Sequence, residues 1–463
     1  MENIQLEGTR FVDKKGRQVL FHGVNVLARS RENNHFYPHL EQVFPYFRRM
    51  GYNLLRLGIF WDGAEPQPGQ VDREYLEKVK SLVDQASAYG LYVILDMHQD
   101  LFAQKFIDGA PDWACLDEGL PNPENCTMWY MAYLSSEAII RAADNFWANK
   151  PAADGVGLLD HYSNMWSEIA QVFDACPNVL GFEPMNEPFM GSVARESFGA
   201  ASMAMAQKNP NFSLAHPEDI SPQEQAEFMG MIAQRFVEFD RTTLMDFYRR
   251  IEKAIRCHSQ KPLITGGNIF CSTDLPTGIQ RLNGPQIFAP HGYDSVVDSD
   301  RYDSFSKENV EHLYQGKRQD QNRLGLPVIV GEWGAFPSKP FTNDLIRHMN
   351  GILEKNLWGD TYCEYRPGME QDNNFSSLCR AYPQRTAGIL ECYHYDEAAR
   401  RFTMAFTAQA KGETVIFCPF GKGSLTCDVP CTSEVEQLED GAALWKIEIS
   451  QPGSVSLTLE EER

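Results

Sequence analysis

The sequence lacks any apolar run long enough to cross a membrane, and it lacks a signal-peptide pattern at its start. The first residues, Met1–Gln5, are neither basic nor continuously apolar. A membrane-spanning helix needs about 20 mostly apolar residues in a row, and no segment supplies them. We therefore expect no integral membrane segment. We also expect a cytoplasmic location, unless a signal peptide has been removed, in which case the protein is secreted.

Positive charge is scarce compared with negative charge. The chain carries 42 Lys and Arg residues against 63 Asp and Glu residues, which gives a net charge of −21 and a pI near 5.0. A field of this sign repels phosphate groups, so it argues against nucleic acid as a partner and against docking on anionic lipids. The charge favours an uncharged small molecule as the substrate. The oligomeric state is not predicted.

Paired cysteines are also missing. The 11 cysteines are an odd number, and none has C-x-x-C spacing, which favours free thiols in a reducing compartment. Cys115 and Cys126 lie in one segment and would pair only in an exported protein. His98 and His291 have no third ligand at a spacing typical of zinc, so we expect no metal site.

Short apolar runs bounded by turn residues recur along most of the 463-residue chain, with helical patterns between them. Arg73–Tyr89, Asn164–Phe173 and Leu244–Ile255 have apolar residues at helical spacing. Alternating strands and helices predict a parallel sheet, and eight such units predict a closed (β/α)8 TIM barrel. The predicted strands are Val19–Gly23, Asn53–Leu57, Tyr92–Asp96, Val179–Glu183, Pro262–Thr265, Gln286–Pro290, Pro327–Gly331 and Thr361–Tyr365.

Two long connections interrupt this rhythm, Gln99–Asp160 after the third strand and Phe189–Asp240 after the fourth. Long insertions of this kind lie on the catalytic face of such barrels, so both are expected to wall a pocket. The second contains methionines that either form a soft, adaptable binding surface or pack as the core of covering helices. These are Met190, Met203, Met205, Met229 and Met231.

From about Gly388 the pattern changes to strict alternation, as in Phe402–Phe406, Thr414–Phe417, Trp445–Ile449 and Val455–Leu459. This pattern predicts a small antiparallel β-sandwich. We assign residues 1–387 to the barrel with its two insertions and residues 388–463 to the sandwich, which we expect to buttress the barrel.

Two motifs place a glutamate just beyond a buried strand: Gly181–Pro188, which contains Glu187, and Val328–Gly334, which contains Glu332. Two carboxyl groups at the C-terminal ends of barrel strands suit glycoside hydrolysis. One protonates the glycosidic oxygen, which requires a raised pKa, while the other attacks the anomeric carbon. We predict Glu187 as acid/base and Glu332 as nucleophile.

The neighbours of these two glutamates have predicted roles as well. Asn186 is placed to hydrogen-bond the sugar 2-hydroxyl, and a salt bridge or a helix cap is the better interpretation of Glu183. If the enzyme retains configuration, the carboxyl groups of Glu187 and Glu332 should lie about 5–5.5 Å apart.

The segments Met185-Asn186-Glu187-Pro188 and Gly331-Glu332-Trp333-Gly334 resemble those of glycoside hydrolase family 5, a family of retaining enzymes with catalytic glutamates on strands four and seven. The resemblance extends over most of residues 15–365. It implies that Arg56 hydrogen-bonds the nucleophile, that Tyr293 contacts the nucleophile carboxylate, and that His291 lies near the acid/base. It implies no cofactor.

A narrower similarity concerns Asp96–Phe102 and Gly109–Ala114. These segments are similar to the endoglycoceramidase branch of the family and to its relatives that act on glucosylceramide and steryl glucosides. The similarity implies that His98 and Asp100 bind hydroxyls of the −1 sugar. One departure stands out: the family usually has a tryptophan on strand eight as a platform for this sugar. Either Tyr362, Tyr365 or Trp358 replaces it here, or the stacking is lost.

We therefore predict a retaining β-glycosidase that works by double displacement. Its expected substrates are β-glucosides or β-galactosides with a hydrophobic aglycone, meaning glycolipids, steryl glycosides or phenolic glycosides. An endo-β-glucanase or β-mannanase is the enzymatic alternative. The alternative from another class is a non-catalytic carbohydrate-binding protein on the same fold. Glucose or galactose specificity and endo or exo cleavage stay open.

Overall fold

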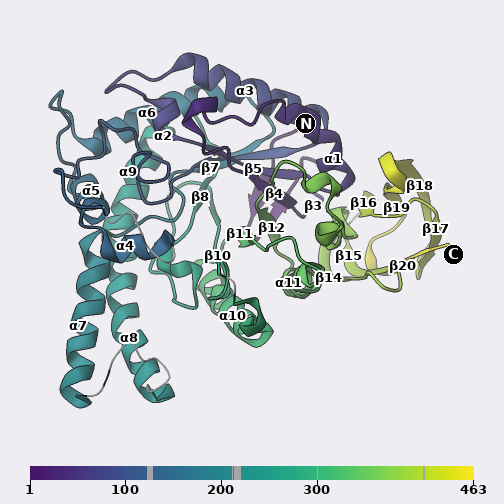
Figure 1. Ribbon diagram of the computed structural model, residues 1–463. Helices are drawn as coiled ribbons and strands as arrows, with labels where there is room; N and C mark the ends of the chain where they lie inside the picture. The colour runs from purple at the N-terminus through teal and green to yellow at the C-terminus, as the bar shows by residue number, and fades with distance from the viewer. Residues whose placement is uncertain (123–128, 211, 213–220, 300, 410–411, 463) are drawn as a thin grey trace.

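The centre of the computed structural model is a curled parallel sheet of nine strands (Figure 1). The structure describes residues 1–122, 129–210, 212, 221–299, 301–409 and 412–462. The strands follow the order β10-β11-β12-β4-β5-β6-β7-β8-β9. Their bounds are β4 (His22–Val26), β5 (Leu54–Ile59), β6 (Tyr92–Met97), β7 (Val179–Glu183), β8 (Leu263–Thr265), β9 (Gln286–Phe288), β10 (His291–Gly292), β11 (Ile329–Gly334) and β12 (Gly359–Cys363).

The two edges of this sheet meet, which confirms the predicted TIM barrel. Strand β9 lies within the predicted sixth strand, Gln286–Pro290, whereas β10 begins just beyond it at His291. Phe288 forms a parallel bridge with Val328, next to the start of β11. The sheet therefore closes on itself, and the C-terminal ends of its strands gather at one mouth.

The first predicted strand is displaced in the structure. Val19 belongs to a separate short strand, β3 (Gln18–Val19), which pairs antiparallel with β2 (Arg10–Val12), and the barrel strand begins only at His22. The side chains of Val19 and Phe11 pack in one core cluster with barrel residues such as Leu54 and Tyr92. The apolar run from Val19 to Gly23 therefore contributes residues to two sheets, the antiparallel sheet through β3 and the barrel through β4.

Helices cover the outside of the barrel (Figure 1). The first long helix, α3, starts after Asp72, whose side chain accepts a hydrogen bond from the N–H of Tyr75, and it buries Leu76, Val79 and Val83. The covering helices are α1 (Phe44–Arg49), α2 (Trp61–Ala64), α3 (Arg73–Ala88), α6 (Leu158–Phe173), α9 (Met245–Ile255), α10 (Lys307–Leu324) and α11 (Thr342–Asn356).

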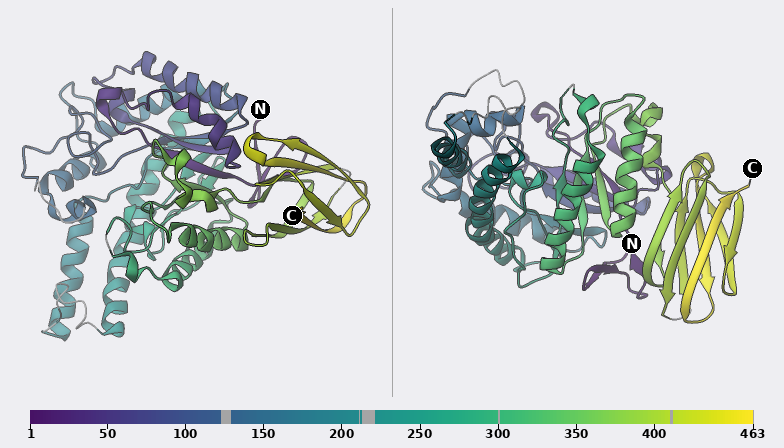
Figure 2. Two further views of the ribbon diagram at one scale, coloured as in Figure 1. Left: turned by 45° about the vertical axis from the view of Figure 1, so that its right-hand side comes forward. Right: turned by 90° about the horizontal axis from the view of Figure 1, so that it is seen from below.

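Both predicted insertions contain helices. The first holds the 3₁₀ turn η3 (Trp129–Met131), α4 (Ala132–Ser135) and α5 (Glu137–Trp147). The second forms a hairpin of α7 (Ser192–Lys208) and α8 (Pro222–Phe239), which projects from the body of the molecule (Figure 2). No helix among the described residues combines the length and hydropathy needed to cross a membrane. Cys115 is a free thiol, and Cys126 lies outside the described residues.

The C-terminal region is an antiparallel sandwich, as predicted. Phe402 and Leu457 from one sheet share a core with Ile416 and Ile447 from the other. The strands of the larger sheet follow the order β1 (Gln5–Glu7), β2, β3, β13 (Tyr382–Thr386), β16 (Gly412–Cys418), β19 (Ala443–Ile449), β18 (Cys431–Gln437). The strands of the smaller sheet follow the order β14 (Gly388–Asp396), β15 (Arg401–Ala408), β20 (Gly453–Glu461), β17 (Gly423–Cys427). The larger sheet thus includes strands from both ends of the chain, and β13 precedes the boundary predicted at residue 388.

Candidate active site

A cavity of about 670 Å³ lies where the parallel strands end. Glu332 reaches it from within β11 and Glu187 from the turn that follows β7. One oxygen of each carboxylate and a ring nitrogen of His291 all lie within 4.8 Å of one another. His291 Nδ1 is 2.9 Å from Glu187 Oε1 and 3.7 Å from Glu332 Oε2. One oxygen of Glu187 thus lies within 4.8 Å of one oxygen of Glu332, a proximity compatible with the roughly 5–5.5 Å between the carboxyl groups of retaining glycosidases.

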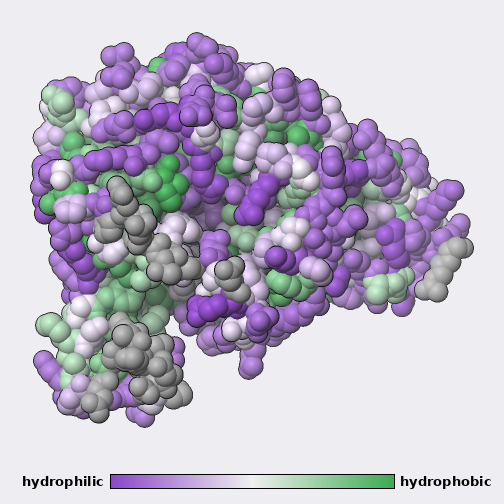
Figure 3. Space-filling model, viewed as in Figure 1, coloured by the Kyte–Doolittle hydropathy of each residue, from purple (hydrophilic) through white to green (hydrophobic). Residues whose placement is uncertain are grey.

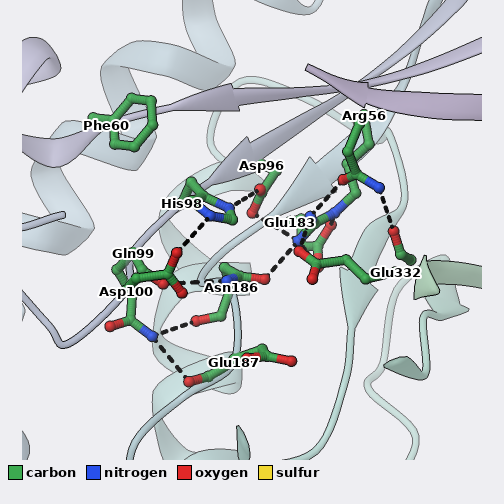
Figure 4. A network of polar contacts seen from close by, with 12 residues as sticks. Arg56, Phe60, Asp96, His98, Gln99, Asp100, Glu183, Asn186, Glu187 and Glu332 are labelled. Carbon is green, nitrogen blue, oxygen red and sulfur yellow. Dashed lines mark hydrogen bonds and ion pairs between the residues drawn. The ribbon is translucent and has the colours of Figure 1, made fainter. Parts of the chain in front are cut away.

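Arg56, on β5, is fully buried and binds several carboxylates (Figure 4). Its Nη1 donates to Glu332 Oε1 at 2.6 Å, so the predicted contact with that glutamate is present. Its Nε and Nη2 donate to the two oxygens of Glu183 at 2.7 and 2.9 Å, and Nη2 also lies 3.1 Å from Asp96. Glu183 is thus an ion-pair partner, in agreement with the salt-bridge interpretation.

Glu332 is held in its ionised form. Burial by itself would raise the pKa of this carboxyl, but His291, Arg56 and His98 outweigh burial and lower the pKa to about 2. The hydroxyl of Tyr293 contributes by donating to Glu332 Oε2 at 2.7 Å, a contact that was expected. A carboxylate that stays ionised at neutral pH is suited to nucleophilic attack.

Glu187 has the opposite environment. Burial raises the pKa of its carboxyl, as do the charges of Glu332 and Asp100, although the hydrogen bond from His291 opposes them. The backbone of Glu187 has φ 39°, an uncommon conformation for a residue other than glycine. Pairs of carboxyls whose surroundings shift their pKa values in opposite directions are typical of an acid and a nucleophile.

The turn that carries Glu187 is fixed by Gln99, a residue that the sequence analysis did not single out. Its Nε2 donates to the backbone oxygens of Asn186 and Glu187 at 2.8 and 2.9 Å. Asn186 in turn donates from Nδ2 to the Gln99 carbonyl at 3.1 Å and accepts from Arg56 at 2.9 Å. Figure 4 shows these contacts around Asn186, next to Glu187 and Arg56.

His98 and Asp100 lie together on a second wall of the cavity. His98 Nδ1 is 2.8 Å from Asp96, and its Nε2 is 3.5 Å from Asp100. Burial would lower the pKa of His98, but the charges of Asp96 and Asp100 outweigh it and raise the pKa. These polar groups suit hydrogen bonds to sugar hydroxyls.

Three further residues belong to this polar network, and two of them, Arg29 and Glu364, line the cavity. Asp108 is fully buried and accepts from the backbone N–H of Asp100 at 2.6 Å. Arg29 donates to Asp100 at 3.3 Å and to Glu364 at 2.7 Å. The sequence offers no local signal for Arg29 or Glu364, because they follow the ends of β4 and β12, which become neighbours only when the barrel closes.

Among the residues that the structure describes, two groups of side chains have the spacing of metal ligands, one of His98, Asp100 and Asp108 and one of Glu187, His291 and Glu332. Each group also contacts a guanidinium. Arg29 lies 3.1 Å from Asp108, and Arg56 lies 2.6 Å from Glu332. A guanidinium already supplies the positive charge that a metal ion would bring, so the arrangement favours hydrogen bonding to hydroxyls.

None of the three aromatic residues considered for the strand-eight platform reaches the cavity. Tyr362 packs against Trp333, Tyr365 packs edge-on against Phe47, and Trp358 donates from its indole N–H to Gln321 at 2.9 Å. Each of the three is at most 3% exposed. Cys363, the last residue of β12, lines the cavity instead. The structure therefore favours the loss of this stacking.

The wall beyond Glu187 is apolar, but the predicted methionines do not form it. It consists of side chains from the first insertion, from the 3₁₀ turn η6 (Ile269–Ser272) and from the segment that follows β10. Met190 and Met205 are each 1% exposed in the core, which supports the packing alternative for these two, and Met203 lies on the outer surface at 65% exposure. The apolar lining residues are Ile107, Trp129, Tyr130, Met131, Leu134, Ile269, Phe270 and Val297.

Comparison with known proteins gives consistent matches. Residues 12–359 match the model of Cellulase (glycosyl hydrolase family 5), and residues 380–443 match the glycoside hydrolase family 5 C-terminal domain. The chain is 31% identical to an endoglycoceramidase of Cyanea nozakii, over 88% of this chain and 82% of that protein. It is 24% identical to endoglycoceramidase I of Rhodococcus hoagii, over 97% of this chain and 89% of that protein.

Solved structures show the same fold. Endo-glycoceramidase II from Rhodococcus sp. superposes with a TM-score of 0.77 at 22% identity, over 98% of this chain and 99% of that one. Sterylglucosidase 1 of Cryptococcus neoformans gives a TM-score of 0.72 at 15% identity, over 99% and 97% of the two chains.

Proposed function

The chain belongs to glycoside hydrolase family 5 and is a glycoside hydrolase, and from this premise we propose that it cleaves β-glucosides or β-galactosides that carry a hydrophobic aglycone. The observation that carries the proposal is a single cavity in which Glu187 and Glu332 stand between a polar wall and an apolar wall. The proposed substrates are glycolipids, steryl glycosides and phenolic glycosides.

The proposed mechanism is double displacement. Glu332 attacks the anomeric carbon while Glu187 protonates the glycosidic oxygen, so that the aglycone leaves as an alcohol. Glu187, now ionised, then removes a proton from water, which attacks the anomeric carbon and releases the sugar from Glu332. The lowered pKa of Glu332 and the raised pKa of Glu187 support this division of roles.

Each further residue has a proposed task. Arg56 and Tyr293 hold the carboxylate of Glu332, and His291 orients Glu187. His98, Asp100 and Asn186 are proposed to bind the hydroxyls of the −1 sugar, because His98 and Asp100 line the cavity with both glutamates and Asn186 directly precedes Glu187.

The apolar wall is the proposed binding site of the aglycone. An acid/base residue stands on the leaving-group side of the bond, and Glu187 lines the cavity together with Met131, Leu134 and Phe270. Apolar burial stabilises a complex by roughly 25 cal/mol per Å², so an aglycone that buries about 150 Å² gains between about 3 and 4 kcal/mol. Relatives named endoglycoceramidase and glucosylceramidase support this substrate class.

A comparison of substrates tests the proposal. We expect kcat/KM for β-glycosides of lipids, sterols or polycyclic phenols to exceed that for cello-oligosaccharides by at least about tenfold, which corresponds to 1.4 kcal/mol. Leu134→Gln together with Phe270→Gln should narrow this difference. Equal or better cleavage of cello-oligosaccharides would instead favour the endoglucanase alternative, and sugar binding without turnover would favour the non-catalytic one.

A further inference from the structure

The α7–α8 hairpin has an apolar interior. Phe198 of α7 packs against Phe228 and Phe236 of α8, with ring centroids 6.1 Å apart in both pairs. Ile232 is fully buried, and Met205 is 1% exposed. These inward side chains join the main core of the barrel and hold the two helices together, so the outer face of the hairpin is not needed for that purpose.

The outer face of α7 is unusual for a protein with a net charge of −21, because it carries no charge over most of its length. From Ser197 to Gln207 no residue is charged, and Ala200, Met203 and Ala206 are exposed. The side chain of Met203 is 65% exposed, more than any other large apolar residue that the structure describes. A helix on the surface of a soluble protein normally presents polar residues to water.

Charged groups are confined to the two ends of the hairpin. Arg235 lies 3.9 Å from Glu196 near the root, and Lys208 pairs with Glu227 near the tip. In the space-filling view, the visible hairpin surface between these ends is largely pale to green, whereas the adjoining body is mostly purple (Figure 3).

The hairpin is joined to the cavity by one aromatic side chain. Phe270 lines the cavity, and its ring contacts Phe236 at 4.9 Å and Phe198 at 5.9 Å between centroids. Met131, which is 45% exposed, lines the same cavity. Apolar surface therefore continues from the wall beside Glu187 to the root of the hairpin.

We propose that the outer face of α7 docks on an uncharged, zwitterionic lipid surface and that an amphiphilic glycoside passes from this surface along Phe270 into the cavity. The inference rests on the proposed function, because only an amphiphilic substrate is presented by a lipid surface. An anionic surface is disfavoured by the net charge of −21. A lipid surface also presents the apolar aglycone of an embedded glycoside to the end of the cavity that lies nearest the root of the hairpin.

The test compares two pairs of substitutions that each add two negative charges. Ala200→Glu with Met203→Glu alters the outer face of α7, and neither side chain lines the cavity. Val156→Glu with Ile389→Glu is the matched control, because these exposed apolar residues, at 39% and 37%, lie outside the hairpin. Thermal unfolding first establishes that both variants fold like the unaltered protein.

Co-sedimentation with phosphatidylcholine vesicles is then measured, together with hydrolysis of a long-chain alkyl β-glucoside embedded in the vesicles or dispersed in detergent. We expect the hairpin variant to lose at least about tenfold in vesicle binding and in hydrolysis on vesicles, and to match the unaltered protein in detergent. The control variant should behave like the unaltered protein throughout.

Three outcomes would overturn the docking proposal: no vesicle binding by the unaltered protein, equal losses in both variants, or a dimer that only the hairpin variant dissociates. The last would assign this face to a second copy of the chain. If vesicle binding depends on the hairpin but no amphiphilic glycoside is cleaved even in detergent, the docking proposal stands and the proposed substrate class fails.

Discussion

Two buried arginines, Arg56 and Arg380, take part in two separate polar networks of the barrel, and their surroundings differ. Arg56 lies near the mouth, with Asp96, Glu183 and Glu332 around it. Arg380, which is 1% exposed, lies on the sandwich side and donates to Asp360 at 3.1 Å and to the hydroxyl of Tyr393 at 2.9 Å.

The two networks differ in how many positive groups and hydrogen-bond donors surround each carboxylate. Asp360 is surrounded by donors: His22 Nδ1 is 3.0 Å away, and the indole N–H of Trp333 donates to it at 3.0 Å. Burial would raise the pKa of Asp360, but His22 and Arg380 outweigh burial and lower it. Near the mouth carboxylates outnumber guanidinium groups, and neighbouring carboxyls have pKa values shifted in opposite directions. A network in which each carboxylate is matched by donors and positive charge stabilises the fold. A network with surplus carboxylates shifts their pKa values in opposite directions, as proton transfer requires.

The largest expected effect is loss of the nucleophile. Glu332→Ala should lower kcat by about 10⁴-fold or more for every substrate, because no covalent intermediate forms. Glu187→Ala should spare the first step for dinitrophenyl glycosides, whose leaving group needs no proton. Azide should then give a β-glycosyl azide with Glu187→Ala and an α-glycosyl azide with Glu332→Ala. The reverse pattern of products would exchange the two roles.

The next largest effect is expected in the network around Asp360 and Arg380, where a substitution should lower the free energy of unfolding. Asp360→Ala leaves Arg380 buried without its carboxylate, and breaking a buried pair in this way costs about 3–5 kcal/mol. Denaturant unfolding should show this loss, while kcat/KM per folded molecule stays unchanged. If kcat/KM falls and stability does not, the distinction between the two networks is wrong.

A smaller effect is expected from removing one hydroxyl near the mouth. Tyr293→Phe deletes the hydrogen bond to Glu332 Oε2, and a bond to a charged group contributes about 1.5–3 kcal/mol. We expect kcat/KM to fall by roughly 10- to 100-fold with little change in unfolding free energy. Tyr393→Phe, which removes a hydroxyl bound to Arg380, is the matched control and should leave kcat/KM unaltered.

The smallest effect is a shift in pH dependence. Activity requires ionised Glu332 and protonated Glu187, so it falls as pH drops through the first pKa and as pH rises through the second. His291 lowers the pKa of both carboxyls. His291→Asn should therefore raise both pKa values and move both limbs of the kcat/KM profile to higher pH. A limb that moves to lower pH would show that His291 acts in the opposite sense.

Much of the fold could be predicted from local pattern. Strict alternation identified β15, β16, β19 and β20, because side chains of successive residues point to opposite faces of a sheet. Helix α3 was predicted to within one residue for a similar reason. The start of β4 was missed, because Val19 and Phe21 are equally apolar although they precede the barrel strand.

By itself, the sequence determined the barrel, the sandwich and the position of Glu187 just past β7, because these depend on short-range periodicity and on motifs within a few residues; Glu332, predicted just beyond its strand, lies within β11. Only the tertiary structure decided that Arg29 meets Asp100, that Cys363 lies where a stacking ring was expected, and that Phe270, and none of the methionines of the second insertion, contributes to the apolar wall. Such contacts join residues far apart in the chain, and they arise only when the sheet closes and brings distant strand ends to one mouth.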